Sequence, residues 1–349
     1  MTPPLLIVNP ACGARGRGAR ALSEVLAGVE RTLGDVLIRY TARRGHAREL
    51  AQAGTLDGHP LIVAVGGDGT FSEIANGVLT ARAGEVGGMG DGAPLSPVPS
   101  LGGMPAPGLV PPPGGAAAAV SSPAVGLINV GTGGDFRRSL GIGPGFEHCL
   151  EALALGRERL VDVGRARFPG RNGEDVEQYF VNVISAGLGG LVDHYIETMP
   201  EALGGKAAYY IASLRAVAAS KERPLLARIT WEDETREETI PAYLVAICNG
   251  RWFGGGMDVA PMALPDDGRF EVVTITAPTK PYLARRVRGV YTGRHLEEPT
   301  VHHFPCTAIE LKLEDAAAER RFLLDVDGDA LGSLPLTVEV VPRVLRVRA

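Results

Sequence analysis

Two glycine-rich segments, Gly66-Gly67-Asp68-Gly69-Thr70 and Gly131-Thr132-Gly133-Gly134-Asp135, each follow a run of apolar residues. Glycine lets the backbone approach a phosphate group closely, and a helix that begins after such a loop directs free N–H groups at the anion. Asp68 suits a magnesium or ribose contact, because a carboxylate that faced bare phosphate would be repelled. The two loops indicate nucleotide binding, with a tight turn capped by Asp68 as the alternative.

A third segment of this kind lies near the amino terminus, where Asn9-Pro10-Ala11-Cys12-Gly13 follows the apolar run Leu5–Val8. Arg15 and Arg17 stand just beyond it and offer positive charge to a phosphate group. The segment lacks the spacing of a Walker A motif, and it is not a GxGxxG turn after the first strand. Classical P-loop and Rossmann dinucleotide sites are therefore disfavoured.

Short apolar runs alternate with helical patterns across the part of the chain that must position these loops. The expected strands and helices are 5–8, 19–32, 36–40, 46–53, 61–65, 125–130 and 146–154. Such alternation predicts βαβ units and a parallel, doubly wound sheet over residues 1–155. Loops at the carboxyl ends of parallel strands face one crevice, so we expect the glycine-rich segments to converge there.

One stretch inside this region departs from the pattern. Residues 82–124 comprise 43 positions, of which 27 are Gly, Pro or Ala and only Arg82, Glu85 and Asp91 are charged. A segment of this composition can bury little apolar surface, and that burial does not offset the entropy lost when the chain is ordered. The composition therefore predicts a disordered insertion. A functional lid is the alternative.

From about residue 160 the pattern changes to closely spaced strands. We expect strands at 160–168, 178–184, 225–231, 240–248, 270–275, 309–313, 322–326 and 336–347, with helices at 207–219 and 283–290. This spacing predicts a mostly antiparallel β domain over residues 156–335. Residues 336–349 form a last strand that can return to the first domain.

Bulk composition narrows the classes of function. The 349 residues suffice for two domains, and a net charge of −5 without a long basic run argues against a nucleic-acid partner. Four cysteines without a CxxC pair favour reduced thiols over a zinc site or a disulfide framework. We find neither an export signal nor an apolar run of bilayer-spanning length, so we expect a cytoplasmic protein without a transmembrane segment.

The sequence NPACG, the GGDGT loop with Glu73 three residues beyond it, and GTGGDF resemble the diacylglycerol kinase and sphingosine kinase family, of the bacterial diacylglycerol kinase type. GGDGT also occurs in NAD kinases and 6-phosphofructokinases. The second half adds Asn249-Gly250 and Asp267-Gly268 in the order that these lipid kinases show, and Asp327-Gly328-Asp329 resembles their DGE element. The resemblance implies an NAD kinase-like nucleotide domain followed by a β-sandwich.

The resemblance also implies roles for single residues. The residues implied to surround ATP are Asn9, Pro10, Gly13, Arg15, Thr41, Gly66, Gly67, Asp68, Gly69, Thr70, Glu73, Gly131, Thr132 and Asp135. Asp68 would position catalytic magnesium, and Asp327 or Asp329 would accept the proton of the acceptor hydroxyl. A structural magnesium would take the Leu264 and Arg269 carbonyls and the Asp267 carboxylate, with a solvated turn as the alternative.

The chain departs from the family pattern at several of these positions. The family usually has proline and asparagine where this chain has Asn129 and Gly134, and the lost amide predicts a looser loop. DGE becomes DGD, a carboxylate shortened by one methylene. That change could shift the geometry of proton abstraction by about 1 Å, which in principle costs around 100-fold in rate.

We therefore expect an ATP-dependent lipid kinase that uses Mg²⁺ and phosphorylates diacylglycerol or a related lipid alcohol. Its partner would be a lipid at the inner face of the membrane, which the protein visits transiently, and a homodimer is a possible assembly. Two alternatives remain. An NAD kinase-type phosphotransferase accounts for GGDGT but less readily for DGD, and a noncatalytic nucleotide-binding regulator accounts for the changed GTGGD loop.

Overall fold

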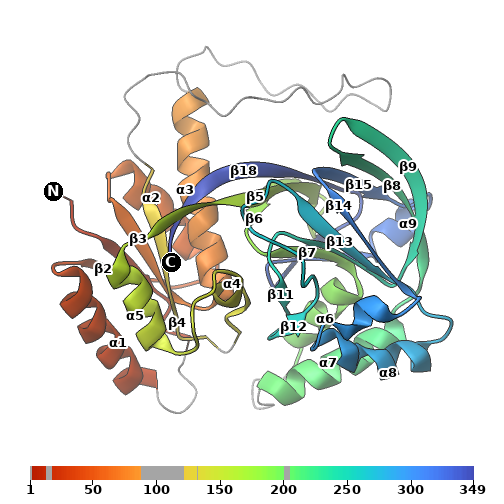
Figure 1. Ribbon diagram of the computed structural model, residues 1–349, viewed down its shortest axis with the longest axis horizontal. Helices are drawn as coiled ribbons and strands as arrows, with labels where there is room; N and C mark the ends of the chain where they lie inside the picture. The colour runs from red at the N-terminus through yellow and green to blue at the C-terminus, as the bar shows by residue number, and fades with distance from the viewer. Residues whose placement is uncertain (1, 13–17, 88–121, 132, 200–204) are drawn as a thin grey trace.

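The computed structural model describes residues 2–12, 18–87, 122–131, 133–199 and 205–349. An α/β half precedes a β-rich half, and the two lie side by side (Figure 1). Among the described residues, no helix combines the length and the apolar content that a bilayer crossing requires.

The α/β half is built on four parallel strands. Its elements are β1 (Leu5–Val8), α1 (Gly18–Leu33), β2 (Leu37–Tyr40), α2 (His46–Leu56), β3 (Leu61–Gly66), α3 (Asp68–Gly87), β4 (Ala124–Asn129), α4 (Asp135–Ser139) and α5 (Phe146–Leu155). The strand order is β2-β1-β3-β4, and β1 and β3 are buried along their whole length. Helix α1 packs with α5 and α2 with α3, which covers the sheet with two helix pairs. The carboxyl ends of the parallel strands thus lie along one edge, where the loops that follow them meet.

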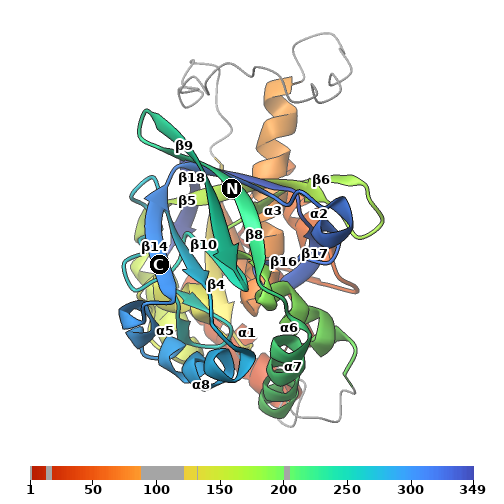
Figure 2. The same ribbon diagram turned by 90° about the vertical axis from the view of Figure 1, so that its right-hand side faces the viewer.

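The β-rich half is a sandwich with a small helical layer. Its strands are β5 (Glu158–Pro169), β6 (Asp175–Phe180), β7 (Val183–Gly187), β8 (Arg223–Trp231), β9 (Glu234–Ala242), β10 (Leu244–Cys248), β11 (Trp252–Phe253), β12 (Met257–Asp258), β13 (Phe270–Ile275), β14 (Val301–Cys306), β15 (Ala308–Lys312), β16 (Leu323–Val326), β17 (Asp329–Ser333) and β18 (Leu336–Arg348). Its helices are α6 (Leu188–Glu197), α7 (Gly205–Ala219), α8 (Lys280–Val290), the 3-10 helix η1 (Arg294–Glu297) and α9 (Ala316–Glu319). Helices α6, α7 and α8 gather at one end of this half (Figure 2).

Two sheets face each other across the sandwich core. An antiparallel sheet of order β14-β13-β10-β7-β16-β17 packs against the antiparallel part of the larger sheet. Buried side chains from both layers, such as Phe180, Phe270 and Leu324, form one apolar cluster. Phe180 and Phe270 stack with ring centroids 5.5 Å apart. Burial of these faces is the main source of stability for the second half.

The long strand β18 joins the two halves. On one side, its first residues pair with β15 in antiparallel fashion and its last residues, Val347 and Arg348, pair in parallel with β4; on the other side, β5 pairs antiparallel with most of its length. One ten-stranded sheet therefore runs through both halves. The predicted fold class, a doubly wound α/β domain followed by an antiparallel β-sandwich, is confirmed.

Several predicted elements differ in their bounds. The strand expected at 178–184 is two strands, because the N–H groups of Val181 and Asn182 leave the ladder and bind a side chain. The strand expected at 240–248 is also divided: β9 ends at Ala242 and β10 begins at Leu244. Between them, the Tyr243 N–H group donates to the carbonyl oxygen of Ile275. Helix α3 continues through residues 82–87, which composition had assigned to the insertion, and β4 begins at Ala124. The rest of that predicted insertion, 88–121, lies outside the described residues.

Candidate functional site

The loops after β1, β3 and β4 meet at one edge of the parallel sheet. The side-chain nitrogen of Asn9 donates to the Thr70 hydroxyl at 3.3 Å, and the side-chain oxygen of Asn9 accepts from the Ala11 N–H group at 3.0 Å. A Cβ atom on Gly131 would lie 2.9 Å from the Cα atom of Gly67. Side chains at this point would push the loops apart, so the approach of the loops explains the glycines.

A cavity of about 470 Å³ opens between Asp329 of the β-rich half and the loops that follow three parallel strands, β1, β2 and β3. The predicted residues that line it are Asn9, Pro10, Thr41, Gly67, Gly69, Thr70, Glu73 and Asp329. Its volume falls in the range of small-molecule sites. The cavity therefore brings most of the first loop, part of the GGDGT segment and one carboxylate of the DGD turn into a single site.

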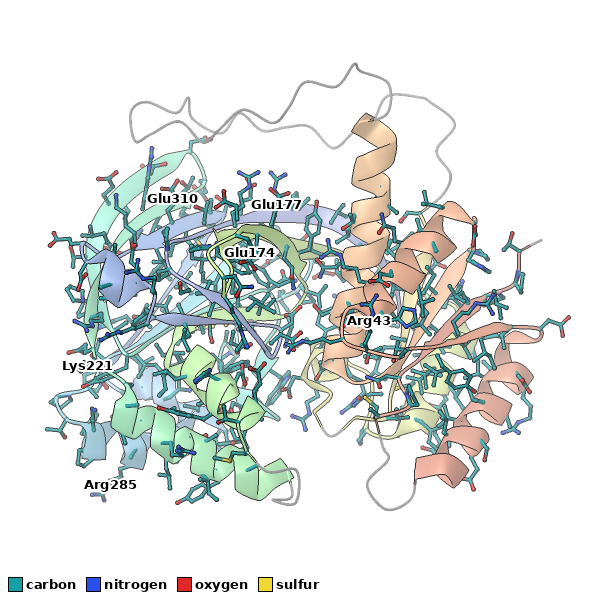
Figure 3. The ribbon with its side chains drawn as sticks, turned by 180° about the vertical axis from the view of Figure 1, so that it is seen from behind. Arg43, Glu174, Glu177, Lys221, Arg285 and Glu310 are labelled. Carbon is teal, nitrogen blue, oxygen red and sulfur yellow. The ribbon has the colours of Figure 1, made fainter. Side chains whose placement is uncertain are left out.

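Two arginines in this cavity were missed by sequence reasoning. Arg43 and Arg44 follow β2 directly and line the cavity together with Ala42 and Ala47. Figure 3 labels Arg43 on the α/β half. Their position after a strand of the parallel sheet, next to the predicted Thr41, was the signal that could have identified them.

Glu73 acts on the backbone that carries these arginines. Its carboxylate accepts from the N–H groups of Gly45 at 2.8 Å and Ala47 at 3.1 Å. Gly45 has a φ of 79°, a conformation in which glycine is favoured. Glu73 thus occupies the amino terminus of α2 and fixes the turn that presents Arg43 and Arg44, although it also lines the cavity.

Asp68 differs from its expected magnesium contact. Its carboxylate accepts from the N–H groups of Gly134 at 2.8 Å, Asp135 at 2.9 Å and Phe136 at 3.3 Å, at the start of α4. The residue is therefore engaged as a cap that binds the GGDGT loop to the GTGGD loop, and it is not among the residues that line the cavity. Oδ2 accepts two of these bonds and Oδ1 only the longest, so Oδ1 keeps a lone pair beside its role in the cap.

Asp135 links the two halves of the protein instead of lining the cavity. One carboxylate oxygen accepts from the Gly255 N–H group at 2.7 Å, and the other lies 3.2 Å from the Arg138 guanidinium. Burial raises the pKa of this carboxyl group, while the Gly255 bond opposes that effect. The glycine run after β11 is thereby tied to the start of α4.

Two further predicted residues, Gly66 and Gly131, do not line the cavity. Gly13, Arg15 and Thr132 lie outside the described residues.

The two departures in the GTGGD loop are in contact with each other. Gly134 has a φ of 81°, and a Cβ atom there would lie 2.2 Å from the side-chain nitrogen of Asn129. Asn129 also accepts from the Gly131 N–H group at 3.2 Å. The side-chain amide of Asn129 thus lies where an amide at position 134 would lie. Its hydrogen bond with the Gly131 N–H group restrains the loop, which was expected to be looser.

Asp327 is held by four hydrogen bonds. Its carboxylate accepts from the Ser72 hydroxyl at 2.7 Å and from the N–H groups of Val181 at 2.9 Å, Asn182 at 2.9 Å and Val183 at 3.1 Å. Burial raises its pKa to about 6, against the lowering effect of these donors. Asp327 also has a φ of 52°, which for a non-glycine residue is costly and is maintained by the bonds.

Asp329 faces the cavity in a different environment. Its side chain is 33% exposed and forms an ion pair with Arg44. Burial raises the pKa of Asp329, and Arg44 opposes that effect. Asp329 can therefore reach a hydroxyl in the cavity directly, whereas Asp327 does not line the cavity and each of its oxygens already accepts two hydrogen bonds.

The loop with the predicted structural magnesium lies outside the cavity. The Asp267 carboxylate lies 3.0 Å from the Arg269 guanidinium, and Leu264 is 56% exposed. Asp162, whose pKa burial raises, accepts from the Gly268 N–H group at 2.7 Å. Within the described residues, no group of three or more His, Cys, Asp or Glu side chains is arranged to hold a metal. The oxygen donors of the loop suit a hard cation, on the condition that Arg269 gives up Asp267.

Comparisons with known proteins cover nearly the whole chain. Residues 3–166 match the diacylglycerol kinase catalytic domain, and residues 182–349 match the YegS C-terminal NAD kinase beta sandwich-like domain. A diacylglycerol kinase of Bacillus subtilis is 25% identical over 334 residues, covering 95% of this chain and 90% of that protein. A protein of Chromohalobacter salexigens named "Probable lipid kinase YegS-like" is 27% identical over 241 residues, covering 68% of this chain and 61% of its own length.

A solved structure supports the same fold. The crystal structure of a diacylglycerol kinase from Bacillus anthracis has a TM-score of 0.62 at 19% identity, and the match covers 99% of this chain and 96% of that one. Both domains and their order agree with the architecture described above. The chain therefore consists of a domain of the diacylglycerol kinase catalytic family followed by a domain of the YegS C-terminal family.

Proposed function

We propose that the protein transfers the γ-phosphoryl group of ATP to the hydroxyl group of diacylglycerol or a related lipid alcohol. The observation that carries this proposal is the cavity that brings the three strand-end loops, two arginines and Asp329 together. Phosphoryl transfer asks a protein mainly for positioning and for neutralisation of charge, and these are the features that this site provides.

Nucleotide phosphates would be bound by backbone and by cations. Gly67 and Gly69 expose backbone at the carboxyl end of β3, next to the amino terminus of α3, where N–H groups and the helix dipole favour an anion. Arg43 and Arg44 add positive charge on the opposite wall. Asn9 holds Thr70 in place and so fixes the first turn of α3.

The DGD turn would accept the proton of the lipid hydroxyl. Asp329 lies in the cavity and needs only to separate from Arg44. Asp327 has a pKa of about 6, which suits a base at neutral pH, but it first has to lose the Ser72 hydrogen bond. The shorter side chain of Asp329, compared with the glutamate of the family pattern, is offset here by its position at the cavity wall.

Magnesium would supply charge neutralisation at the bound phosphates. The Asp68 carboxylate accepts from N–H groups at the start of α4, so its proposed role includes holding the two glycine loops together. Leu264, Asp267 and Arg269 are proposed as a structural magnesium loop in the β-rich half. The lipid partner implies transient contact with the inner face of a membrane.

The proposal is tested by incubating the purified protein with Mg²⁺ and γ-labelled ATP in the presence of diacylglycerol, a sphingoid base, a polyprenol or NAD. We expect label in a lipid phosphomonoester that partitions into organic solvent. Label in NADP would instead identify an NAD kinase-type enzyme. Binding of ATP with no labelled product for any acceptor would identify a regulator.

A further inference from the structure

Arg44 belongs to the α/β half but is paired with the β-rich half. It stands between β2 and α2, and its guanidinium lies 3.1 Å from the carboxylate of Glu197 on α6 and in contact with that of Asp329 on β17. Its side chain is 53% exposed at the wall of the nucleotide cavity. One cation thus bridges both halves across the site.

The neighbouring Arg43 shows a different arrangement. It also lines the cavity, but its guanidinium pairs at 2.7 Å with Glu49, which lies on α2 of the same half. Arg43 and Arg44 therefore match in charge, sequence position and access to the cavity. They differ in that only Arg44 is bound to the other half.

A nucleotide triphosphate competes for these cations. Among the described residues that line the cavity, Arg43 and Arg44 are the only lysines or arginines, whereas Glu73 and Asp329 are both carboxylates. A polyanion entering this cavity draws the guanidinium toward itself, since a phosphate binds arginine at least as well as a carboxylate does. Glu197 keeps a partner when Arg44 leaves, because Arg171 lies 2.6 Å from it.

We propose that Arg44 is a positioning residue that exchanges its carboxylate partners Asp329 and Glu197 for the phosphates of the bound nucleotide. The exchange frees Asp329 only when a nucleotide is present, so nucleotide binding prepares the turn that accepts the proton. This inference rests on the proposed nucleotide site, but not on the identity of the lipid or on which aspartate is the base.

The test is calorimetric affinity for a nonhydrolysable β,γ-imido analogue of ATP with Mg²⁺, which requires no lipid. Glu197→Gln removes a competitor for Arg44 and should tighten binding roughly two- to fivefold, about 0.4–1 kcal/mol, the size of an exposed ion pair. Arg44→Gln should weaken binding by about tenfold. In the Arg44→Gln background, Glu197→Gln should have no further effect.

Matched variants separate this exchange from general electrostatics. Glu49→Gln removes the same charge beside Arg43, the cavity arginine that is paired within its own half, and so measures the tightening that follows from freeing any arginine of the cavity. In an Arg43→Gln background, Glu197→Gln should still tighten binding. Unchanged or weaker binding by Glu197→Gln, or an equal effect with and without Arg44, overturns the inference while the proposed function stands. Absence of analogue binding by the wild-type protein overturns both.

Discussion

Asp327→Asn is expected to destabilise the fold, because the Asp327 carboxylate accepts four hydrogen bonds. Oδ1 accepts from the N–H groups of Asn182 and Val183, and Oδ2 accepts from the Val181 N–H group and the Ser72 hydroxyl. Asparagine keeps one oxygen, so its NH₂ group must face one pair of donors. The least costly orientation directs this NH₂ group at Ser72, whose hydroxyl can reverse and accept, and leaves the Val181 N–H group without a partner.

The magnitude follows from that single unpaired group. A buried N–H group without a partner costs about 1–3 kcal/mol, and because burial outweighs the hydrogen bonds in raising the pKa of Asp327, loss of the charge adds nothing to this cost. A total of about 2.5 kcal/mol lowers Tm by roughly 5–10 °C for a domain of this size. Thermal unfolding followed by circular dichroism at pH 7.5 measures the change.

Asp329→Asn is the control, since it removes the same charge two residues away from a half-exposed ion pair. That pair contributes about 1 kcal/mol or less, so Tm should fall by about 4 °C or less. The reasoning is refuted if Asp327→Asn melts within about 2 °C of the wild-type protein, or if Asp329→Asn lowers Tm as much as Asp327→Asn does.

Three further predictions concern turnover, the glycine loop and the metal. If Asp327 is the base, kcat/KM should fall as the pH drops below about 6, where its carboxylate becomes protonated; an acid limb near pH 4 would exclude Asp327 as the base. Gly134→Asn should weaken ATP affinity because the new side chain meets Asn129, and adding Asn129→Pro should restore part of the loss, which calorimetry on both variants measures. Millimolar Mg²⁺ should raise the Tm of the wild-type protein but not that of Asp267→Ala, and an equal rise in both would place the metal elsewhere.

The parallel sheet and most of the sandwich strands could be predicted because their signals are local. Buried runs such as Leu61–Gly66 and Phe270–Ile275 are bounded by turn residues, so the length and the hydrophobic pattern of each run are enough to identify it as a strand. The sequence did not reveal that Val181 and Asn182 leave the ladder, because their partner Asp327 lies about 145 positions away. Helix α6 was missed for a related reason. Its first turn contains Gly189 and Gly190, which have poor helix propensity, and tertiary contacts with β16 hold it.

The site was predicted in its residue types more than in its roles. Glycine loops at strand ends could be read from the chain, since their spacing follows the βαβ pattern. The sequence did not predict that Asp68 caps α4, because only the fold brings those backbone N–H groups near its carboxylate, and its contact with magnesium stays a prediction. Arg44 could have been placed at a strand end from the sequence alone, but its ion pairs could not be predicted, since Glu197 and Asp329 lie in the other half.

The central claim is tested most directly by the identity of the phosphorylated product. ATP whose γ-phosphoryl oxygens carry ¹⁸O is incubated with the protein, Mg²⁺ and diacylglycerol vesicles, and the extracted lipid is examined by mass spectrometry. We predict a lipid phosphomonoester that carries the label and that is reduced on the order of 100-fold or more in at least one of Asp327→Asn and Asp329→Asn. An unphosphorylated lipid pool, with the label only in free phosphate, would contradict the account.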